Sequence, residues 1–300
     1  MTDNLRVAVV GVGYLGRFHA LIYSRMPSVE LVGVVDTDAA RAQAVAREAG
    51  CPVCPDAASL LGKVDAVSVV VPTTVHRAVA EPFLSRGVHM LLEKPIAATL
   101  EEGAHLVGLA ERAGAILQIG HLERFNAGVM ALARQIDRPR FMEAQRMGGF
   151  VERATDVDVV TDLMIHDIDI VLSLMDAELQ RVSAVGSPVL TSHVDIANAR
   201  LEFANGAAAN VVASRVSEKK TRRIRVFQAQ KYISLDFIEQ TMDVAYPRRV
   251  PGKDRPEILR ERVRVEPVKP LDRELEEFVD CVRTGRRPLV HGRVGLDALD

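Results

Sequence analysis

The first 120 residues alternate between short, almost wholly apolar runs and longer stretches in which apolar residues recur every three or four positions. Nearly continuous apolar runs are typical of parallel strands that are covered on both faces. The predicted strands are residues 5–10, 30–36, 65–71, 88–93 and 115–120. The predicted helices between them are 14–25, 38–49, 75–86 and 100–113. This order predicts a doubly wound parallel sheet.

The pattern changes after residue 120, where polar residues occupy every second position of several strand-like runs. The predicted strands are 140–147, 197–203, 207–214, 222–228, 232–237 and 259–266, and the predicted helices are 124–135, 162–175 and 271–284. Asn205-Gly206 is a strong hairpin signal. We therefore predict an α/β fold with two domains: a parallel sheet over 1–120, and a second α/β domain over 121–300 with an open, mostly antiparallel sheet. Residues 292–300 resemble the start of a helix that is cut short.

Composition narrows the class of protein. A net charge of −2, 4% aromatic residues and no Trp argue against a nucleic-acid partner, and no apolar run approaches the roughly 20 residues that span a bilayer. Three cysteines and no signal-peptide layout at the N-terminus favour the cytoplasm. Cys51 and Cys54 form a CxxC, but prolines interrupt the segment, so we interpret it as a loop that leads into a strand rather than a redox or zinc site.

A GxGxxG motif, Gly11 to Gly16, directly follows the first predicted strand and opens a helix. In this context the glycines permit a tight turn and a close approach of backbone N–H groups to a pyrophosphate. Asp36 ends the next strand, 20 residues after Gly16. Its carboxylate would accept a hydrogen bond from a ribose hydroxyl and repel a 2′-phosphate, which favours NAD over NADP. Arg41 leaves NADP open as the alternative, although it is expected inside the next helix rather than beside Asp36.

Two further strand ends are expected at the ligand-binding edge of the sheet. Pro72 and Thr73 precede His76 at the first of them, and Glu93-Lys94-Pro95 closes the strand 88–93. The Lys94 ammonium would stabilise an oxygen anion that develops during a reaction. The following proline restricts Lys94 to an extended backbone and is compatible with a cis bond. The predicted cofactor-binding residues are Gly11, Gly13, Tyr14, Leu15, Gly16, Asp36, Pro72, Thr73, His76, Glu93 and Lys94.

Three ionisable residues, Asp162, His166 and Asp169, are expected on one face of the largely apolar helix 162–175. Charged side chains are rarely buried unless they are paired or have a function. We therefore interpret His166 as a general base that Asp162 orients. The alternatives are a metal site built from the three residues, for which no second ligand cluster is visible, and a capped helix with a structural His.

Together, GVGYLG at 11–16, EKP at 93–95 and DxxxHxxD at 162–169 resemble the Gfo/Idh/MocA family of oxidoreductases. The resemblance implies an N-terminal Rossmann domain and a second domain whose open sheet often forms a homo-oligomer interface. It implies Lys94, Asp162 and His166 as the catalytic set. His166 would take a hydroxyl proton while a hydride leaves the same carbon for the nicotinamide.

The segment GHLERFN at 120–126, together with DLMIHDID at 162–169, resembles a branch of that family that oxidises UDP-N-acetylglucosamine at C3 for amino-sugar lipid A synthesis. Relatives of that branch oxidise the corresponding uronate. An aminotransferase would act on the product. Arg124, Arg146 and Arg153 are candidates for a diphosphate. The predicted substrate-binding residues are Lys94, His121, Arg124, Phe125, Asp162 and His166.

Other functions stay open at this point. One is a dehydrogenase of polyols or free sugars, and another is the reverse reaction, reduction by NADH. A third is an NAD-binding regulatory protein without activity, which the retained Lys94 and His166 argue against.

Overall fold

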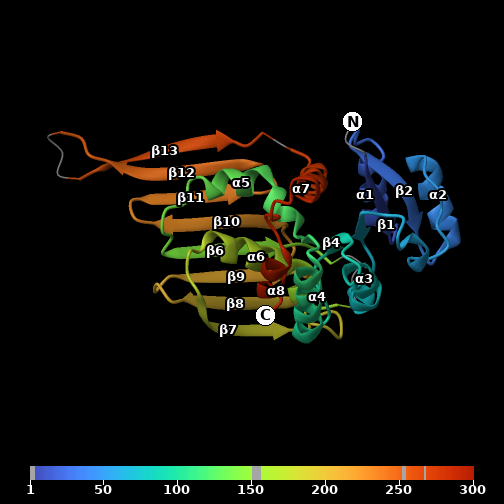
Figure 1. Ribbon diagram of the computed structural model, residues 1–300. Helices are drawn as coiled ribbons and strands as arrows, with labels where there is room; N and C mark the ends of the chain where they lie inside the picture. The colour runs from blue at the N-terminus through green and yellow to red at the C-terminus, as the bar shows by residue number, and fades with distance from the viewer. Residues whose placement is uncertain (1–3, 151–156, 252–254, 267) are drawn as a thin grey trace. The chain divides into compact units, whose positions relative to one another are not determined.

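The computed structural model describes residues 4–150, 157–251, 255–266 and 268–300. The chain forms two compact units, one made of Met1–Leu122 with Lys269–Asp300 and the other of Glu123–Val268. Each unit is built on its own sheet (Figure 1). The first boundary lies close to the predicted one, but the last segment, which the sequence placed with the second domain, belongs to the first compact unit.

The sheet of the first unit is wholly parallel, with the strand order β2-β1-β3-β4-β5. Its strands are β1 (Leu5–Val10), β2 (Val29–Val35), β3 (Ala66–Val69), β4 (His89–Glu93) and β5 (Leu117–Gly120). Its helices are α1 (Tyr14–Tyr23), α2 (Ala39–Ala49), α3 (His76–Leu84), α4 (Leu100–Ala113), α7 (Pro270–Thr284) and α8 (Gly292–Asp297). Short 3-10 turns lie at Ala58–Leu60, Thr73–Val75 and Leu122–Phe125.

The local sequence explains where these elements begin and end. The Asp38 side chain accepts hydrogen bonds from the first backbone N–H groups of α2, as expected at a helix N-cap. Gly50, Gly114 and Gly285 end α2, α4 and α7 in the left-handed conformation, which only glycine adopts without strain. The doubly wound fold predicted for this part of the chain is confirmed.

The two C-terminal helices complete the first unit. Leu275, Phe278 and Val279 of α7 are buried in the same core as the strand residues Val7 and Val9, and α8 packs against α4 and β5. The amphipathic pattern of 271–284 therefore predicts the helix but not the core that it joins.

The Cys51–Cys54 segment runs along the edge of the parallel sheet. Val53 forms an isolated parallel bridge with Val34, and the Cys54 backbone N–H donates to the Val34 oxygen at 2.8 Å. Both thiols are free, and burial raises the pKa of Cys51 to about 11. A thiol that stays protonated at neutral pH is a poor nucleophile.

The second unit contains an eight-stranded sheet in the order β13-β12-β11-β10-β6-β9-β8-β7. Only the β6–β9 pair is parallel among the described strand pairs of this sheet. The strands are β6 (Phe141–Met147), β7 (Leu179–Ser187), β8 (Ile196–Phe203), β9 (Ala208–Ser214), β10 (Thr221–Gln228), β11 (Lys231–Asp236), β12 (Thr241–Arg248) and β13 (Glu257–Arg264). Its helical segments are α5 (Ala127–Ala133), a π-helical turn (Val160–Met164) and α6 (Ile165–Leu174).

One face of this sheet carries the core of the second unit. Buried and exposed residues alternate along β8, as the period of two predicts. Helices α5 and α6 and the π-helical turn pack on the buried face (Figure 1). The mostly antiparallel open sheet is therefore confirmed. No helix in the described part of the chain combines the length and the apolar character that crossing a bilayer requires.

Candidate active site

The glycine turn between β1 and α1 has the tight geometry that the motif predicts. Gly11 has a φ of +86°, and a Cβ there would lie 2.3 Å from the backbone oxygen of Val70. A Cβ at Gly16 would lie 1.9 Å from the Gly11 oxygen. Both positions therefore require glycine, one for the turn and one for the close packing of α1 on the sheet.

The outer side of the same turn is open. Apart from Gly13 and its chain neighbours, no heavy atom of the described residues lies within 4 Å of the position that a Cβ of Gly13 would take. Gly13 precedes α1, whose first residue, Tyr14, is 80% exposed, while Leu15 is half-buried. An open glycine at the start of a helix that packs tightly behind it fits the cradle of a dinucleotide pyrophosphate.

Asp36 is tied to this turn. Its Oδ2 accepts a hydrogen bond from the Val12 backbone N–H at 2.8 Å, and its Oδ1 accepts from the Asp38 N–H at 2.8 Å. Arg41 Nη1 lies 3.4 Å from the same Oδ1, so the expectation that Arg41 is not beside Asp36 is wrong. Arg41 lies in the first turn of α2, which begins soon after β2 ends, so its guanidinium reaches the Asp36 carboxylate. The carboxylate favours NAD, whereas the neighbouring arginine is the kind of group that accommodates a 2′-phosphate.

At the end of β3, Pro72 is exposed and Thr73 half-buried, but His76 is buried. The two ring nitrogens of His76 lie 2.9 Å from the Val71 oxygen and 3.3 Å from the Ile96 oxygen. Burial lowers the pKa of His76. The imidazole thus joins two backbone segments, which argues against the predicted contact of His76 with a cofactor.

Glu93 and Lys94 lie where β4 ends, and the Lys94–Pro95 peptide bond is cis, as the motif allows. Glu93 is buried, with one oxygen 3.4 Å from Nε2 of the buried His19. A Cβ at Gly120 would lie 2.8 Å from the Glu93 carboxyl atoms, so glycine at the end of β5 leaves room for that carboxyl group. Lys94 is half-buried.

In the second unit, Asp162 lies in the π-helical turn Val160–Met164 and His166 in the first turn of α6. Both side chains are half-buried. Sequence periodicity predicts a regular helix from Asp162, but the chain winds with a wider turn there. Such π-helical turns occur frequently at functional sites.

Asp169 pairs with an arginine of the same unit. Its Oδ1 accepts a hydrogen bond from Arg124 Nη1 at 3.2 Å. Burial raises the pKa of Asp169 to about 7, although Arg124 opposes the shift. Among the described residues, the grouping of three metal-ligand side chains that the geometry does give lies elsewhere, in the first unit.

Arg146 is committed to an ion-pair network, so its predicted role toward a diphosphate is wrong. Its guanidinium donates to both oxygens of Asp167 at 2.8 and 3.0 Å and to Glu123 at 2.9 Å. Burial alone would lower the pKa of Arg146, but the two carboxylates outweigh it and raise that pKa above its ordinary value. A guanidinium that two carboxylates already neutralise has little left for a phosphate. Arg153 lies outside the described residues.

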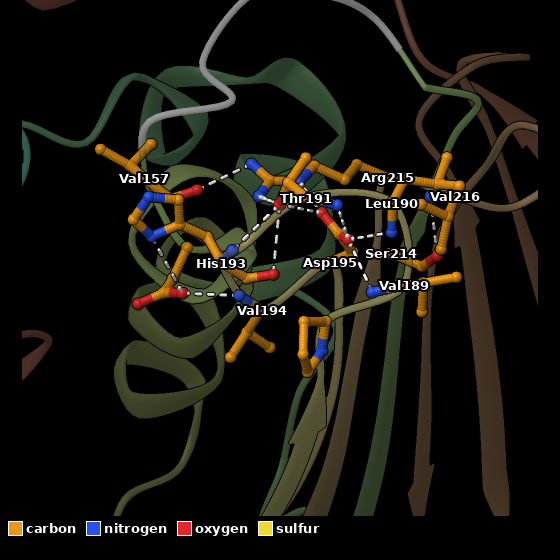
Figure 2. A network of polar contacts seen from close by, with 12 residues as sticks. Val157, Val189, Leu190, Thr191, His193, Val194, Asp195, Ser214, Arg215 and Val216 are labelled. Atoms are coloured by element: carbon orange, nitrogen blue, oxygen red, sulfur yellow. Dashed lines mark hydrogen bonds and ion pairs between the residues drawn. The ribbon is translucent and has the colours of Figure 1, made fainter.

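The start of the π-helical turn is fixed by a buried network around Asp195 (Figure 2). The Asp195 carboxylate accepts hydrogen bonds from the backbone N–H groups of Val189, Leu190 and Thr191. It also accepts from Arg215 Nε at 2.7 Å. Burial alone would raise the pKa of Asp195, but these donors hold it well below its ordinary value.

Arg215 links Asp195 to the segment that precedes Asp162. Its Nη1 donates to the Val157 oxygen at 2.7 Å (Figure 2). The Asp158 carboxylate accepts from the Val194 N–H at 2.7 Å, and the Val159 N–H donates to the Val194 oxygen at 2.9 Å. The backbone leading into the π-helical turn is therefore held from two sides.

The remaining predicted substrate residues follow β5. His121 and Phe125 are buried, and Arg124 shares its charge with Asp169. Contact of these three residues with a substrate stays a prediction.

A five-stranded parallel sheet with a glycine turn and an acidic residue after its second strand is typical of a dinucleotide-binding domain. Residues 5–121 match the oxidoreductase family with an NAD-binding Rossmann fold, and residues 125–233 match the GFO/IDH/MocA C-terminal domain. The chain belongs to the GFO/IDH/MocA oxidoreductase family, as its motifs predicted.

Individual relatives extend this similarity over the whole chain. UDP-N-acetylglucosamine 3-dehydrogenase from Acidithiobacillus ferrooxidans is 40% identical over 97% of this chain and 93% of its own length. Its structure superposes with a TM-score of 0.92 at 38% identity, covering 99% of this chain and 95% of that one. The NAD-dependent scyllo-inositol 2-dehydrogenase of Bacillus subtilis is 29% identical over 97% of this chain and 90% of its own length.

Sequence reasoning missed several residues that organise the candidate site. His19 and Glu274 lie beside Glu93 in space but far from it in the chain. Asp195 and Arg215 each stand in strand-like or loop segments with no motif around them. The available signal was a charged residue placed next to apolar core residues, which identifies a buried charge without naming its partner.

Proposed function

We propose that this protein is an NAD-dependent dehydrogenase that oxidises the C3 hydroxyl of UDP-N-acetylglucosamine to the 3-keto sugar. The observation that carries the proposal is the 40% identity, over nearly the whole of both chains, to an enzyme named for that reaction. Retention of EKP and DxxxHxxD in this chain supports it.

Each proposed catalytic residue has a distinct task. NAD, when bound, supplies the hydride acceptor. His166 takes the proton from the sugar hydroxyl, and Asp162 supports the imidazole in the orientation that this transfer requires. Lys94 stabilises the negative charge that develops on the oxygen. The glycine turn and Asp36 hold the dinucleotide.

The proposal includes the setting of the reaction. The substrate is a nucleotide-linked sugar and the cofactor NAD rather than NADP, because an acidic residue after the second strand is the group that accepts from a ribose hydroxyl in this fold. We further propose a cytoplasmic homo-oligomer, with lipid A synthesis as its context. An aminotransferase would consume the ketone, which draws an otherwise stalling oxidation forward.

The second candidate is a polyol dehydrogenase, and the inositol dehydrogenase relative is the observation that favours it. A substrate panel separates the two. NADH formation is measured with UDP-N-acetylglucosamine, its uronate, glucose and myo-inositol, with and without an aminotransferase that traps the ketone. Turnover of UDP-N-acetylglucosamine is expected, and turnover of inositol alone would contradict the nucleotide-sugar assignment.

The catalytic roles have their own test. Lys94→Ala and His166→Ala are each expected to lower kcat by about 100-fold or more, the typical contribution of a positioned acid or base. NAD affinity, measured by quenching or calorimetry, should stay near that of the wild type. Near wild-type turnover in both variants would refute the assigned roles, and loss of NAD binding would reassign the residues to the cofactor.

A further inference from the structure

Three buried ionisable side chains meet beside the EKP turn, and all of them belong to the first compact unit. His19 comes from α1, Glu93 from the end of β4 and Glu274 from α7. One ligand atom of each lies within 4.8 Å of the others, and His19 and Glu274 are fully buried. We call these three residues the buried triad.

The buried triad is poorly satisfied by its surroundings. Within the part of the chain that the structure describes, neither ring nitrogen of His19 and neither carboxyl oxygen of Glu274 has a hydrogen-bond partner. The contact between His19 Nε2 and Glu93 Oε1, at 3.4 Å, is longer than a strong charge-assisted hydrogen bond. Buried groups of this kind require a proton, a water molecule or an ion among them.

Charge balance favours a proton. The cluster brings two carboxyl groups together in a buried place, so a proton on one of them relieves their mutual repulsion. Burial raises the pKa of Glu274 well above its ordinary value, and the nearby carboxylates of Glu93 and Glu277 add to the shift. The other titratable group facing the cluster is Tyr23 of α1, which burial keeps protonated.

The buried triad bears directly on Lys94, because Glu93 is the preceding residue. Glu93 is held against Gly120 on one side and His19 on another. The backbone of Glu274 is held as well, since Gln118 Nε2 of β5 donates to its oxygen at 3.1 Å. Contacts that restrict Glu93 also restrict the backbone of the next residue, Lys94.

We propose that Glu274 is a positioning residue: in its protonated form it shares a proton with Glu93 and His19 and thereby holds the EKP turn so that Lys94 keeps its orientation. The separation of up to 4.8 Å is one that a single bridging water or a small side-chain rotation spans. The proposal rests on the function proposed for Lys94. A divalent cation held by the same three side chains is the competing occupant.

The test compares Glu274→Gln, which mimics the protonated acid, with Glu274→Leu, which cannot hydrogen-bond. The readout is the rate at which Lys94 reacts with an amine-modifying reagent, followed by mass spectrometry from pH 7 to 10, with no substrate present. We expect Glu274→Leu to raise this rate by about threefold or more, because a loosened Lys94 gains exposure. Glu274→Gln should restore the wild-type profile. Glu276→Gln, an exposed position on the same helix, is the matched control.

A second measurement covers the case in which Glu274→Leu does not fold. A carboxyl group whose pKa is raised by folding stabilises the fold below its unfolded value, about 4.5, and loses that contribution as pH rises. The Tm of Glu274→Gln minus that of the wild type should therefore increase between pH 5 and 9. A constant difference would overturn the protonated state proposed for Glu274.

Two further outcomes also overturn the proposal. One is unchanged Lys94 reactivity in a folded Glu274→Leu. The other is a stoichiometric metal in the purified wild type, measured by elemental analysis, that Glu274→Gln lacks. Because the Lys94 readout needs no substrate, absence of turnover with every sugar tested would refute the proposed function and leave this result standing.

Discussion

We expect the choice between NAD and NADP to depend on Asp36. Its two oxygens hold the Val12 and Asp38 backbone N–H groups, so the residue shapes the glycine turn as well as offering an acceptor to a ribose. Arg41 lies 3.4 Å away, and half of its side chain is exposed. Removal of the carboxylate would leave this guanidinium paired with Asp38 alone, near the end of the second strand, where a 2′-phosphate binds in this fold.

We therefore expect Asp36→Ala to weaken NADH binding by about 10-fold or more, which corresponds to the loss of one hydrogen bond to a charged group. NADPH binding should improve relative to NADH, because the repulsive carboxylate is gone and Arg41 pairs with the phosphate. Fluorescence titration with both dinucleotides measures the ratio. In the control, Asp36→Ala with Arg41→Ala, the gain for NADPH should disappear. An unchanged NADH to NADPH ratio in the single variant would contradict this role.

The role of a single residue is predictable where a motif determines its backbone conformation. It is not predictable where the role depends on which side chains contact the residue in the fold. Gly11 and Gly16 follow from spacing, because only glycine fits the turn and the close packing. Arg146 looks from the sequence like a free cation, yet it pairs with carboxylates 21 and 23 positions away. His76 likewise turns inward to backbone oxygens. Residue type indicates chemistry, whereas availability depends on contacts that only the fold sets.

Elements were predictable in proportion to how much of each is buried. The five parallel strands are apolar almost throughout, and all were predicted within a few residues. The hydrophobic pattern predicts no strand at β7 or β12, because nearly all of β7 is exposed and Pro247 interrupts the pattern of β12. The π-helical turn at Val160–Met164 was also missed, since hydrophobic periodicity does not distinguish it from an α-helix.

The Asp195 network makes a prediction at this scale, because it fixes the backbone leading into Asp162. Replacing Asp195 with Ala removes the carboxylate that accepts from a buried guanidinium and several backbone N–H groups, so we expect Tm to fall by roughly 5 °C or more. The pKa of Asp195 is lowered in the folded state, so its contribution is complete above the ordinary value of 3.8 and is lost as pH falls. The difference in Tm between variant and wild type should stay constant from pH 8 to 5 and become smaller in stronger acid.

Thermal unfolding across that pH range measures the effect. Arg200→Ala, which breaks the exposed pair between Arg200 and Glu202, is the control and should change Tm very little. A loss of similar size in both variants, or a gap that widens in acid, would show that Asp195 is not the anchor of this segment.

At the scale of the whole molecule, the two ends of the chain build one unit. The first unit takes α7 and α8 from residues that follow the entire second sheet. Residues of α7, including Phe278, share a core with Val7 of β1 and Tyr23 of α1. The half that binds the dinucleotide is therefore complete only after the chain has returned to it. Sequence patterns assign each element to the domain of its neighbours in the chain. They therefore do not show that α7 and α8 belong to the first unit.

This topology predicts a local effect of a remote substitution. Phe278→Ala removes a fully buried ring from the first unit, at a typical cost of about 3–5 kcal/mol. Hydrogen exchange measured by mass spectrometry should then show lost protection in β1 and α1, together with weaker NADH binding, although residue 278 lies far along the chain from the glycine turn. Phe237→Ala is the matched control, because Phe237 is buried in the core of the second unit and its loss should expose β11 while leaving β1 protected. Loss of protection in the second sheet alone on Phe278→Ala would mean that α7 stabilises the other unit, and the assignment of the C-terminal segment to the first would be wrong.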